Sequence, residues 1–169
     1  MLKPFSLTSS LVLAIVSLPA MAVTVQRVDV PMSTENCQAA LPAFDGLIRH
    51  RPLAVQNEGT SNAFITCGFI GSNGATPQNY AIEVLLRNDG SAAATVSCTL
   101  IDGRSNLNDP IFLVKSVSVA AGSVAFPIVW TANLDNGGIL FHFPAVSCSI
   151  PPHVGIQATA RFYNEDVGA

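Results

Sequence analysis

Charged residues are scarce in this chain of 169 residues, because Asp, Glu, Lys and Arg together make up only 11% of it. Typical soluble domains carry about a quarter. The few Lys and Arg residues form no basic patch, which argues against a nucleic-acid partner, and there is no acidic tail or block of like charge. The polar surface must therefore come from Asn, Ser, Thr and Gln, a composition typical of secreted β-proteins.

Motifs for metal binding and catalysis are also absent. The chain has no H-E-x-x-H pair, no G-x-S-x-G elbow and no C-x-x-C. His50 is flanked by two arginines that would repel a cation, His142 alternates with phenylalanines in an expected strand and should lie on its outer face, and His153 follows two prolines in a turn. We interpret all three as isolated surface histidines. The sequence therefore predicts no catalytic residue, no cofactor-binding residue and no metal ligand.

Acidic side chains are scattered along the chain. Glycoside hydrolysis needs two carboxylates held within about 5–10 Å of each other, and nothing in the sequence brings together any two of Glu58, Glu83, Asp135, Glu165 and Asp166. The most oxygen-rich stretch is the loop 102–110, which contains Asp102, Asn106, Asn108 and Asp109. It lacks the spacing and the final Glu of an EF-hand, so we interpret it as a solvated loop, with calcium binding as the alternative.

Aromatic platforms for stacking on sugars are in short supply, since the chain has one Trp and two Tyr. Trp130 shares a strand face with apolar residues (Val124, Phe126 and Ile128), and Tyr80 shares one with Ile82, Val84 and Leu86. Both are predicted to lie in the core. Tyr163 is predicted to be exposed beside Arg161 and Asn164. This distribution weakens a carbohydrate-binding hypothesis without removing it.

Concentrated positive charge occurs only at Ile48-Arg49-His50-Arg51-Pro52, close to Glu58. We interpret this segment as a solvated loop. The alternative is a contact with an anionic sugar or a phosphate.

The first 22 residues read as a secretory signal. Met1-Leu2-Lys3 is a short positive start, Leu7 to Leu18 is apolar, and Ala20-Met21-Ala22 is an A-x-A cleavage signature. Cleavage would leave 169 − 22 = 147 residues starting at Val23, one domain's worth, with a net charge near 7 − 11 = −4 once Lys3 is lost. No second run of about 20 apolar residues follows, and no cysteine at the cleavage point would carry a lipid anchor.

Alternation at period two, broken by Gly, Pro, Asn and Asp, runs through the rest of the chain. It predicts about eight strands, near 23–30, 63–69, 80–86, 94–100, 111–120, 123–131, 138–150 and 154–162. We expect 23–60 to be a loop-rich entry segment after its first strand, 111–131 to be a hairpin turning at Ala121-Gly122, and 138–150 to be one strand bent at Pro144. The predicted fold is an antiparallel β-sandwich of jelly-roll or Greek-key kind, with a closed barrel as the alternative.

Four cysteines, Cys37, Cys67, Cys98 and Cys148, lie after the signal and read as two disulfides. Three pairings are possible. We favour Cys98–Cys148, because both lie in mid-strand beside apolar neighbours, and Cys37–Cys67, which would fasten the entry segment to the core. No two cysteines are closer than 30 positions, which argues against a metal or redox site.

Three short motifs resemble a group of secreted proteobacterial proteins without a known activity: Ile65-Thr66-Cys67, Val96-Ser97-Cys98-Thr99-Leu100 and Cys148-Ser149-Ile150-Pro151-Pro152. The resemblance covers nearly the whole chain after the signal. It implies a four-cysteine β-sandwich secreted by, or kept in the periplasm of, a Gram-negative bacterium. It assigns no activity and no functional residues.

Export, disulfides and the lack of a catalytic constellation favour a non-enzymatic structural or interaction module that needs no cofactor. Its partner would be a protein or a glycan at the cell surface. The alternative is a carbohydrate-binding or carbohydrate-acting protein, which rests on analogy between folds. A third hypothesis is a fibre subunit that exchanges the strand Val23 to Val30 between copies.

Overall fold

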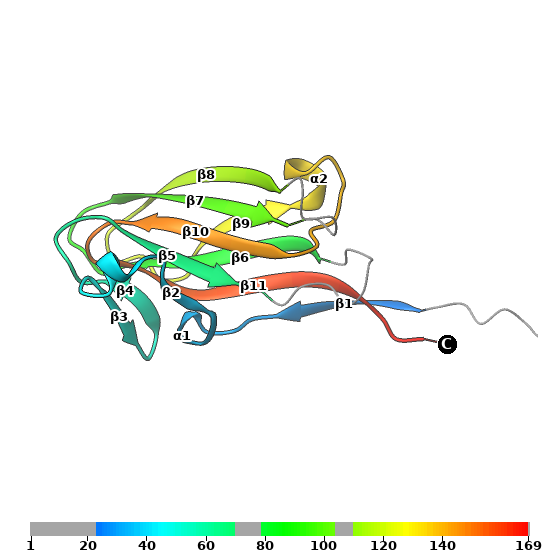
Figure 1. The fold of residues 1–169 in the computed structure, drawn as a ribbon, viewed down its shortest axis with the longest axis horizontal. Helices are drawn as coiled ribbons and strands as arrows, with labels where there is room; N and C mark the ends of the chain where they lie inside the picture. Colours follow the sequence, from blue (N-terminus) through cyan, green and yellow to red (C-terminus); the bar gives the residue numbers. More distant parts are fainter. Residues whose placement is uncertain (1–22, 70–78, 104–109, 169) are drawn as a thin grey trace, which may run out of the picture.

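Two antiparallel β-sheets lie face to face in the computed structural model, which describes residues 23–69, 79–103 and 110–168 (Figure 1). The predicted signal segment, residues 1–22, lies outside the described residues. Within them, no helix has the length and apolar character needed to cross a membrane. The chain changes sheet at most connections, and in the described part only β3–β4 and β7–β8 are successive strands paired in one sheet. The predicted antiparallel β-sandwich is confirmed.

Sheet A has the order β3-β4-β11-β6-β9, and β1 also pairs with β11. Its strands are β1 (Thr24–Asp29), β3 (Ile48–Arg51), β4 (Ala54–Asn57), β6 (Asn79–Asn88), β9 (Phe126–Thr131) and β11 (Val154–Asp166). The start of β11 pairs with β4 and its end pairs with β1. Val23 and Gly168 therefore meet at one end of the sandwich, where the Val23 N–H donates to the Gly168 carbonyl at 3.2 Å.

Sheet B has the order β2-β5-β10-β7-β8. Its strands are β2 (Cys37–Ala39), β5 (Ala63–Gly68), β7 (Ala94–Asp102), β8 (Ile111–Val119) and β10 (Pro144–Ile150). Short helical turns connect the sheets, namely α1 (Ser33–Asn36), η1 (Pro42–Phe44) and α2 (Ala132–Asp135). Both predicted disulfides lie in this sheet and join residues that face each other, Cys37 with Cys67 and Cys98 with Cys148.

Eight of the eleven strands in the described residues correspond to the eight predicted ones. The other three, β2, β3 and β4, lie in the entry segment that the sequence predicted to be mostly loop. They are only three or four residues long and are separated by prolines and glycines, so no period-two pattern can develop. Pairing with β5 and β11 supplies the order that the local sequence does not.

The predicted hairpin at Ala121-Gly122 is wrong. Gly122 does occupy a turn with φ +71°, but β8 pairs with β7 in sheet B and β9 pairs with β6 in sheet A. The connection crosses from one sheet to the other. The predicted bent strand is also wrong in its first half, because β10 begins at Pro144 and the preceding residues make only one isolated bridge, from Phe141 to Asn79.

Apolar side chains from both sheets fill the interior. Trp130, Ile82, Val84, Leu86, Ile65, Leu100 and Ile150 are fully buried. The core prediction for Trp130 is therefore confirmed. Its indole Nε1 donates to the Leu113 carbonyl at 3.0 Å, which gives the one polar atom of the ring a partner.

Bulges in sheet A change which residues face the core. A register shift between Ile156 and Ala158 places Thr159, opposite Val84, on the inner face, and turns Ala158 and Ala160 outward. The predicted apolar face Val154, Ile156, Ala158, Ala160 and Phe162 is therefore correct only as far as Ile156. One extra residue in a strand moves every later side chain to the opposite face of the sheet.

Tyr80 also sits at a register shift, because Phe162 pairs with Ala81 while Tyr163 pairs with Asn79. Its ring is half-buried and packs against Phe162 with the ring centroids 6.2 Å apart. The prediction that Tyr80 lies in the core is wrong.

Two buried asparagines connect strand ends of sheet A to sheet B. The Asn57 amide donates to the carbonyl of Ile150 at the end of β10, and the Asn88 amide donates to the carbonyl of Val119 at the end of β8, each at 2.8–2.9 Å. Their Oδ1 atoms accept from the N–H groups of Gly59 and Gly90. The predicted turn at Asn88-Asp89-Gly90 is thus confirmed and also links the two sheets.

The edge strands β8 and β9 hold each other through side chains. Lys115 of β8 donates to the Val129 carbonyl of β9 at 2.7 Å, and Trp130 of β9 donates to the Leu113 carbonyl of β8. Lys115 also pairs with Asp135 of α2 at 2.8 Å. We call this arrangement the edge clasp.

Candidate binding site

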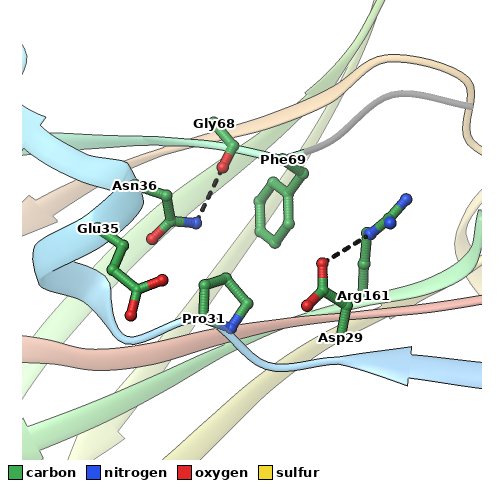
Figure 2. A pocket seen from close by; sticks show the side chains of 7 residues that line it. All are labelled: Asp29, Pro31, Glu35, Asn36, Gly68, Phe69 and Arg161. Carbon is green, nitrogen blue, oxygen red and sulfur yellow. Dashed lines mark hydrogen bonds and ion pairs between the residues drawn. The ribbon is translucent and has the colours of Figure 1, made fainter.

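A cavity of about 250 Å³ opens on the side of the sandwich where the edge of sheet A faces the edge of sheet B. Its lining comes from four elements: Asp29 and Pro31 at the end of β1, Glu35 and Asn36 in α1, Gly68 and Phe69 at the end of β5, and Arg161 in β11. Figure 2 shows the Phe69 ring between Asn36 on one side and the Asp29–Arg161 pair on the other, with Pro31 across the cavity.

The short helix α1 forms one wall and is fixed from both sides. Ser33 is fully buried, and its Oγ accepts from the Val55 N–H of sheet A at 3.0 Å. The Asn36 amide donates to the Gly68 carbonyl of sheet B at 2.9 Å and to Thr159 Oγ1 of sheet A at 2.8 Å. Asn36 therefore holds the two sheet edges at a set distance and shapes the cavity.

Arg161 forms the opposite wall, and its side chain is only 12% exposed. Its Nε donates to Asp29 Oδ2 at 3.2 Å, and its guanidinium lies 4.2 Å from the centroid of the Tyr163 ring. The bulge after Ile156 brings Arg161 to this inner side of β11. A cation held by a carboxylate and an aromatic face keeps one orientation.

The cavity combines an apolar surface with convergent polar groups. Phe69 and Pro31 provide the apolar part, and Asp29, Glu35 and Asn36 provide oxygen acceptors around it. Glu35 is exposed. The volume lies below the range of about 300–1,000 Å³ usual for drug-sized ligands, so the cavity fits a single small ring.

The basic segment singled out in the sequence, Ile48–Pro52, forms β3 and the turn after it instead of a free loop. Arg51 makes a two-pronged ion pair with Glu58 at 2.6 and 2.8 Å. This pair lowers the pKa of Glu58 and raises that of Arg51. Arg49 donates to the carbonyls of Asp45 and Ile48. Its positive charge is thus partly matched within the protein, which disfavours the anion-binding alternative.

Of the other acidic residues considered from the sequence, only Glu165 and Asp166 share an element, namely β11. Asp135 pairs with Lys115, and Glu165 pairs with Arg27 at 2.8 Å. Glu83 lies on the outer face of β6 opposite Ala160 and Val129, and burial raises its pKa. In the described part of the chain, no three His, Cys, Asp or Glu residues cluster as a metal site would require.

The histidines do not all lie where the sequence predicted. His50 and His153 are exposed. His142 is only 2% exposed and stacks on Phe143 with ring centroids 4.1 Å apart. The surface prediction for His142 is wrong because residues 142–143 form a bend, with their N–H groups bound to Asp102 Oδ1, instead of a strand. The rest of the candidate calcium loop, residues 104–109, lies outside the described residues.

Sequence reasoning missed every residue that lines the cavity. Asp29, Glu35, Asn36 and Phe69 are dispersed over 40 positions and form no motif. Arg161 was noticed only as a neighbour of Tyr163, which is half-buried beneath its guanidinium. The one signal in the sequence is that Arg161 is a charged residue beside the apolar positions of a predicted strand. The bulge that turns its side chain inward cannot be recognised from the alternation of apolar and polar residues.

No protein-family model and no curated protein matches the chain. Solved structures that resemble it include a GH26-CBM35 β-(1,4)-mannanase of Podospora anserina, with 12% identity, a TM-score of 0.44, and coverage of 79% of this chain and 27% of that one. An exo-β-1,3-galactanase of Phanerochaete chrysosporium with galactose has 11% identity, a TM-score of 0.39, and coverage of 82% and 29%.

TmCBM61 in complex with β-1,4-galactotriose has 10% identity, a TM-score of 0.34, and coverage of 82% of this chain and 88% of that one. The chain therefore spans less than a third of the first two proteins and most of the third. At these identities and TM-scores, the likeness assigns no function to this chain.

Proposed function

We propose that the chain is an exported, non-enzymatic module that binds carbohydrate, with one sugar ring held in the cavity between α1, β5 and β11. The observation that carries this proposal is the lining of the cavity, in which Phe69 and Pro31 are surrounded by Asp29, Glu35, Asn36 and Arg161. A sugar ring has apolar C–H faces and a rim of hydroxyl groups. Such a ligand matches an aromatic wall flanked by carboxylates and an amide.

Rigidity of the site supports the binding of a small ligand. Asn36 contacts both sheets, and Arg161 is held by Asp29 and Tyr163. Preorganised polar groups reduce the entropic cost of capturing a small ligand. The proposal thus replaces the exposed Trp platform, which Trp130 cannot provide, with a compact polar cavity.

A glycan array followed by calorimetry tests the proposal on the chain that begins at Val23. We expect a glycan hit whose affinity falls about 10-fold or more in Glu35→Gln, because a hydrogen bond to a charged group contributes about 1.5–3 kcal/mol. Phe69→Ala should also weaken binding, because it removes the aromatic wall of the cavity. Glu83→Gln is the matched control, since this carboxylate lies on the outer face of sheet A. If the wild-type protein binds no glycan, the interaction module has another kind of partner and the proposal fails.

Export is supported by the signal pattern of residues 1–22 and by two disulfides, which persist in oxidising compartments. Expression in a Gram-negative host followed by intact-mass measurement of the periplasmic and medium fractions tests it. We expect a mass that corresponds to loss of 22 residues. Recovery of the protein only in the cytoplasm, with Met1 retained, would refute export.

A further inference from the structure

The outward-facing side chains of sheet B form a second surface of unusual composition. The strand registers place them in cross-strand rows: Gly68, Ala145, Ile101 and Phe112 in the first, Gln38, Thr66, Ser147, Thr99 and Val114 in the second, Phe64, Ser149, Ser97 and Ser116 in the third, and Thr95 with Ser118 in the fourth. All are exposed or half-buried. We call this surface the hydroxyl face.

No ionisable side chain belongs to these four rows, each of whose members is a described residue. Sheet A differs, because Glu83 and Arg87 face outward on β6 and four ion pairs involve its strands or the turns that follow them. A charged ligand placed on the hydroxyl face would lose hydration without meeting an opposite charge. The face therefore suits a neutral partner.

Hydroxyl groups occupy the centre of the face. Ser116 donates to Ser97 Oγ at 3.0 Å, and Thr66 donates to Ser147 Oγ at 3.4 Å. A hydroxyl has one donor and two acceptor positions, so these pairs keep capacity for a ligand. A hydroxyl-rich centre is unlike the apolar core of an interface between protein copies, and it matches a partner that is itself rich in hydroxyls.

Two exposed phenylalanines mark opposite corners of the face. Phe64 on β5 is 44% exposed and Phe112 on β8 is 62% exposed. They lie three strand spacings and four residues apart in register, which corresponds to about 20 Å across an ideal sheet. An extended chain of several sugar units could contact both rings and cross the hydroxyl groups between them.

The hydroxyl face and the cavity meet at Gly68. This residue ends the first row and also lines the cavity, and a Cβ built on it would touch no described residue within 4 Å. Among the described residues, none blocks a bound chain at the point where it would pass from one to the other.

We infer that the hydroxyl face is an extended platform for a neutral polysaccharide, with the chain continuing from the sugar held in the cavity. This inference rests on the proposed function and adds to it the ligand class: a neutral chain of several units, distinct from a single sugar or an anionic polymer.

The test compares ligands of different length on Thr99→Lys, which places a charge at the centre of the face. Thr24→Lys is the matched control, because Thr24 is an exposed strand residue of β1. The probes are neutral β-1,4-mannan, β-1,4-galactan and cellulose, the monosaccharide units of each, and anionic alginate. We expect Thr99→Lys to weaken binding of the neutral polysaccharide at least 10-fold without changing binding of its monosaccharide, and Thr24→Lys to change neither.

Phe112→Ala provides a second variant with little effect on the fold, because the ring is exposed. We expect it to weaken polysaccharide binding about 3-fold or more at an unchanged melting temperature. Wild-type affinity for the polysaccharide in both Thr99→Lys and Phe112→Ala overturns the platform, as does tighter binding of alginate than of any neutral polymer. Dimerisation in light scattering that Thr99→Lys abolishes, without any effect on glycan binding, also overturns it and assigns the face to a second copy.

Failure of the proposed cavity site gives a different result. If Glu35→Gln and Phe69→Ala bind every ligand like the wild type while Thr99→Lys loses the polysaccharide, the cavity assignment is wrong and the platform is supported. If the cavity variants lose the monosaccharide and Thr99→Lys binds every ligand normally, the cavity is supported and the platform is wrong.

Discussion

Sheets A and B are braced by different chemistry. Both disulfides join neighbouring strands of sheet B, β2 to β5 and β7 to β10. Four of the five ion pairs found among the described residues involve the strands of sheet A or the turns that follow them, and the fifth joins β8 to α2. Covalent bonds do not respond to salt or to moderate changes in pH, whereas exposed ion pairs respond to both.

The difference teaches how a sheet can present an uncharged surface. A broad polar face without charged side chains has no ion pairs to stabilise the sheet. In sheet B, the two disulfides between buried cysteines stabilise the strands from the inner face. Sheet A carries charged side chains on both faces, Glu83 and Arg87 outward and Arg161 toward the cavity, and neither disulfide joins its strands. The two sheets therefore divide stability and surface chemistry between them, and the following predictions test that division.

Loss of the bridges should have the largest effect. Replacing all four cysteines by serine should lower the free energy of unfolding by about 2–5 kcal/mol for each bridge. Replacing Arg27 and Arg87 by glutamine removes two ion pairs of sheet A and should cost about 0–1 kcal/mol for each. Denaturant unfolding of both variants measures the two quantities. An equal loss of unfolding free energy in the cysteine and arginine variants would contradict the idea that disulfides stabilise sheet B more than ion pairs stabilise sheet A.

Trp130→Ala should lower the free energy of unfolding by about 3–5 kcal/mol, because it opens a large cavity in the core between the sheets. Trp130→Phe should cost less, since it keeps most of the apolar volume and loses the bond to Leu113 and only part of the ring. In the wild type, indole fluorescence should be blue-shifted and resistant to acrylamide. A red-shifted, readily quenched emission would show that the ring does not lie between the sheets.

Asn88→Ala should destabilise the fold by about 1–3 kcal/mol, because it leaves the carbonyls of Val119 and Ala92 and the N–H of Gly90 without their partner. Asn57→Ala should behave in the same way at the other link between the sheets. Asn133→Ala, at an exposed position of α2, is the control. Thermal unfolding measures all three, and a loss in Asn133→Ala as large as in Asn88→Ala would argue against this role of the links.

Two substitutions in sheet A or the turn beside it should have the smallest effects, with opposite signs. The bond to Arg51 lowers the folded-state pKa of Glu58, so the stability it contributes is present above the unfolded pKa and disappears as the pH falls through the folded one. Burial raises the folded-state pKa of Glu83, so its penalty is absent below the unfolded pKa and complete above the folded one.

Melting temperatures at pH 7 and at about pH 3, below the usual carboxylate pKa range, measure these effects. Glu58→Gln should melt below the wild type at pH 7, and Glu83→Gln should melt above it. Both differences should shrink at the lower pH. Same-sign changes at pH 7 would contradict the environments assigned to these two carboxylates.

The sequence predicted features that depend on local alternation and missed those that depend on register. Strands such as β5 and β7 have a regular pattern and were located to within one or two residues, and the pair Cys98–Cys148 followed from its strand positions. The pair Cys37–Cys67 was favoured because it would fasten the entry segment to the core, and the structure has it as well. The crossing between β8 and β9 was missed because a turn at Gly122 looks the same in a hairpin and in a connection between sheets.

The cavity could not be predicted for the same reason. Arg161 reaches it through a bulge in β11, and Asn36 reaches it through a four-residue helix within a segment without periodicity. Neither feature has a local sequence signal. Tyr80 shows the opposite case, in which a regular pattern gives a wrong prediction. Its alternation with Ile82 predicts a core position, but Tyr80 has no partner in β11 and its side chain turns outward.

The edge clasp has a consequence for self-association. The outer strands of an open sheet present unpaired backbone groups that can recruit a strand from another molecule. Here the outward carbonyls of Leu113 and Val129 are already bound by the side chains of Trp130 and Lys115. A second molecule would have to displace an indole and an ammonium group before it could add a strand, so this side of the sandwich resists growth into aggregates even though β8 exposes Phe112 and Val114.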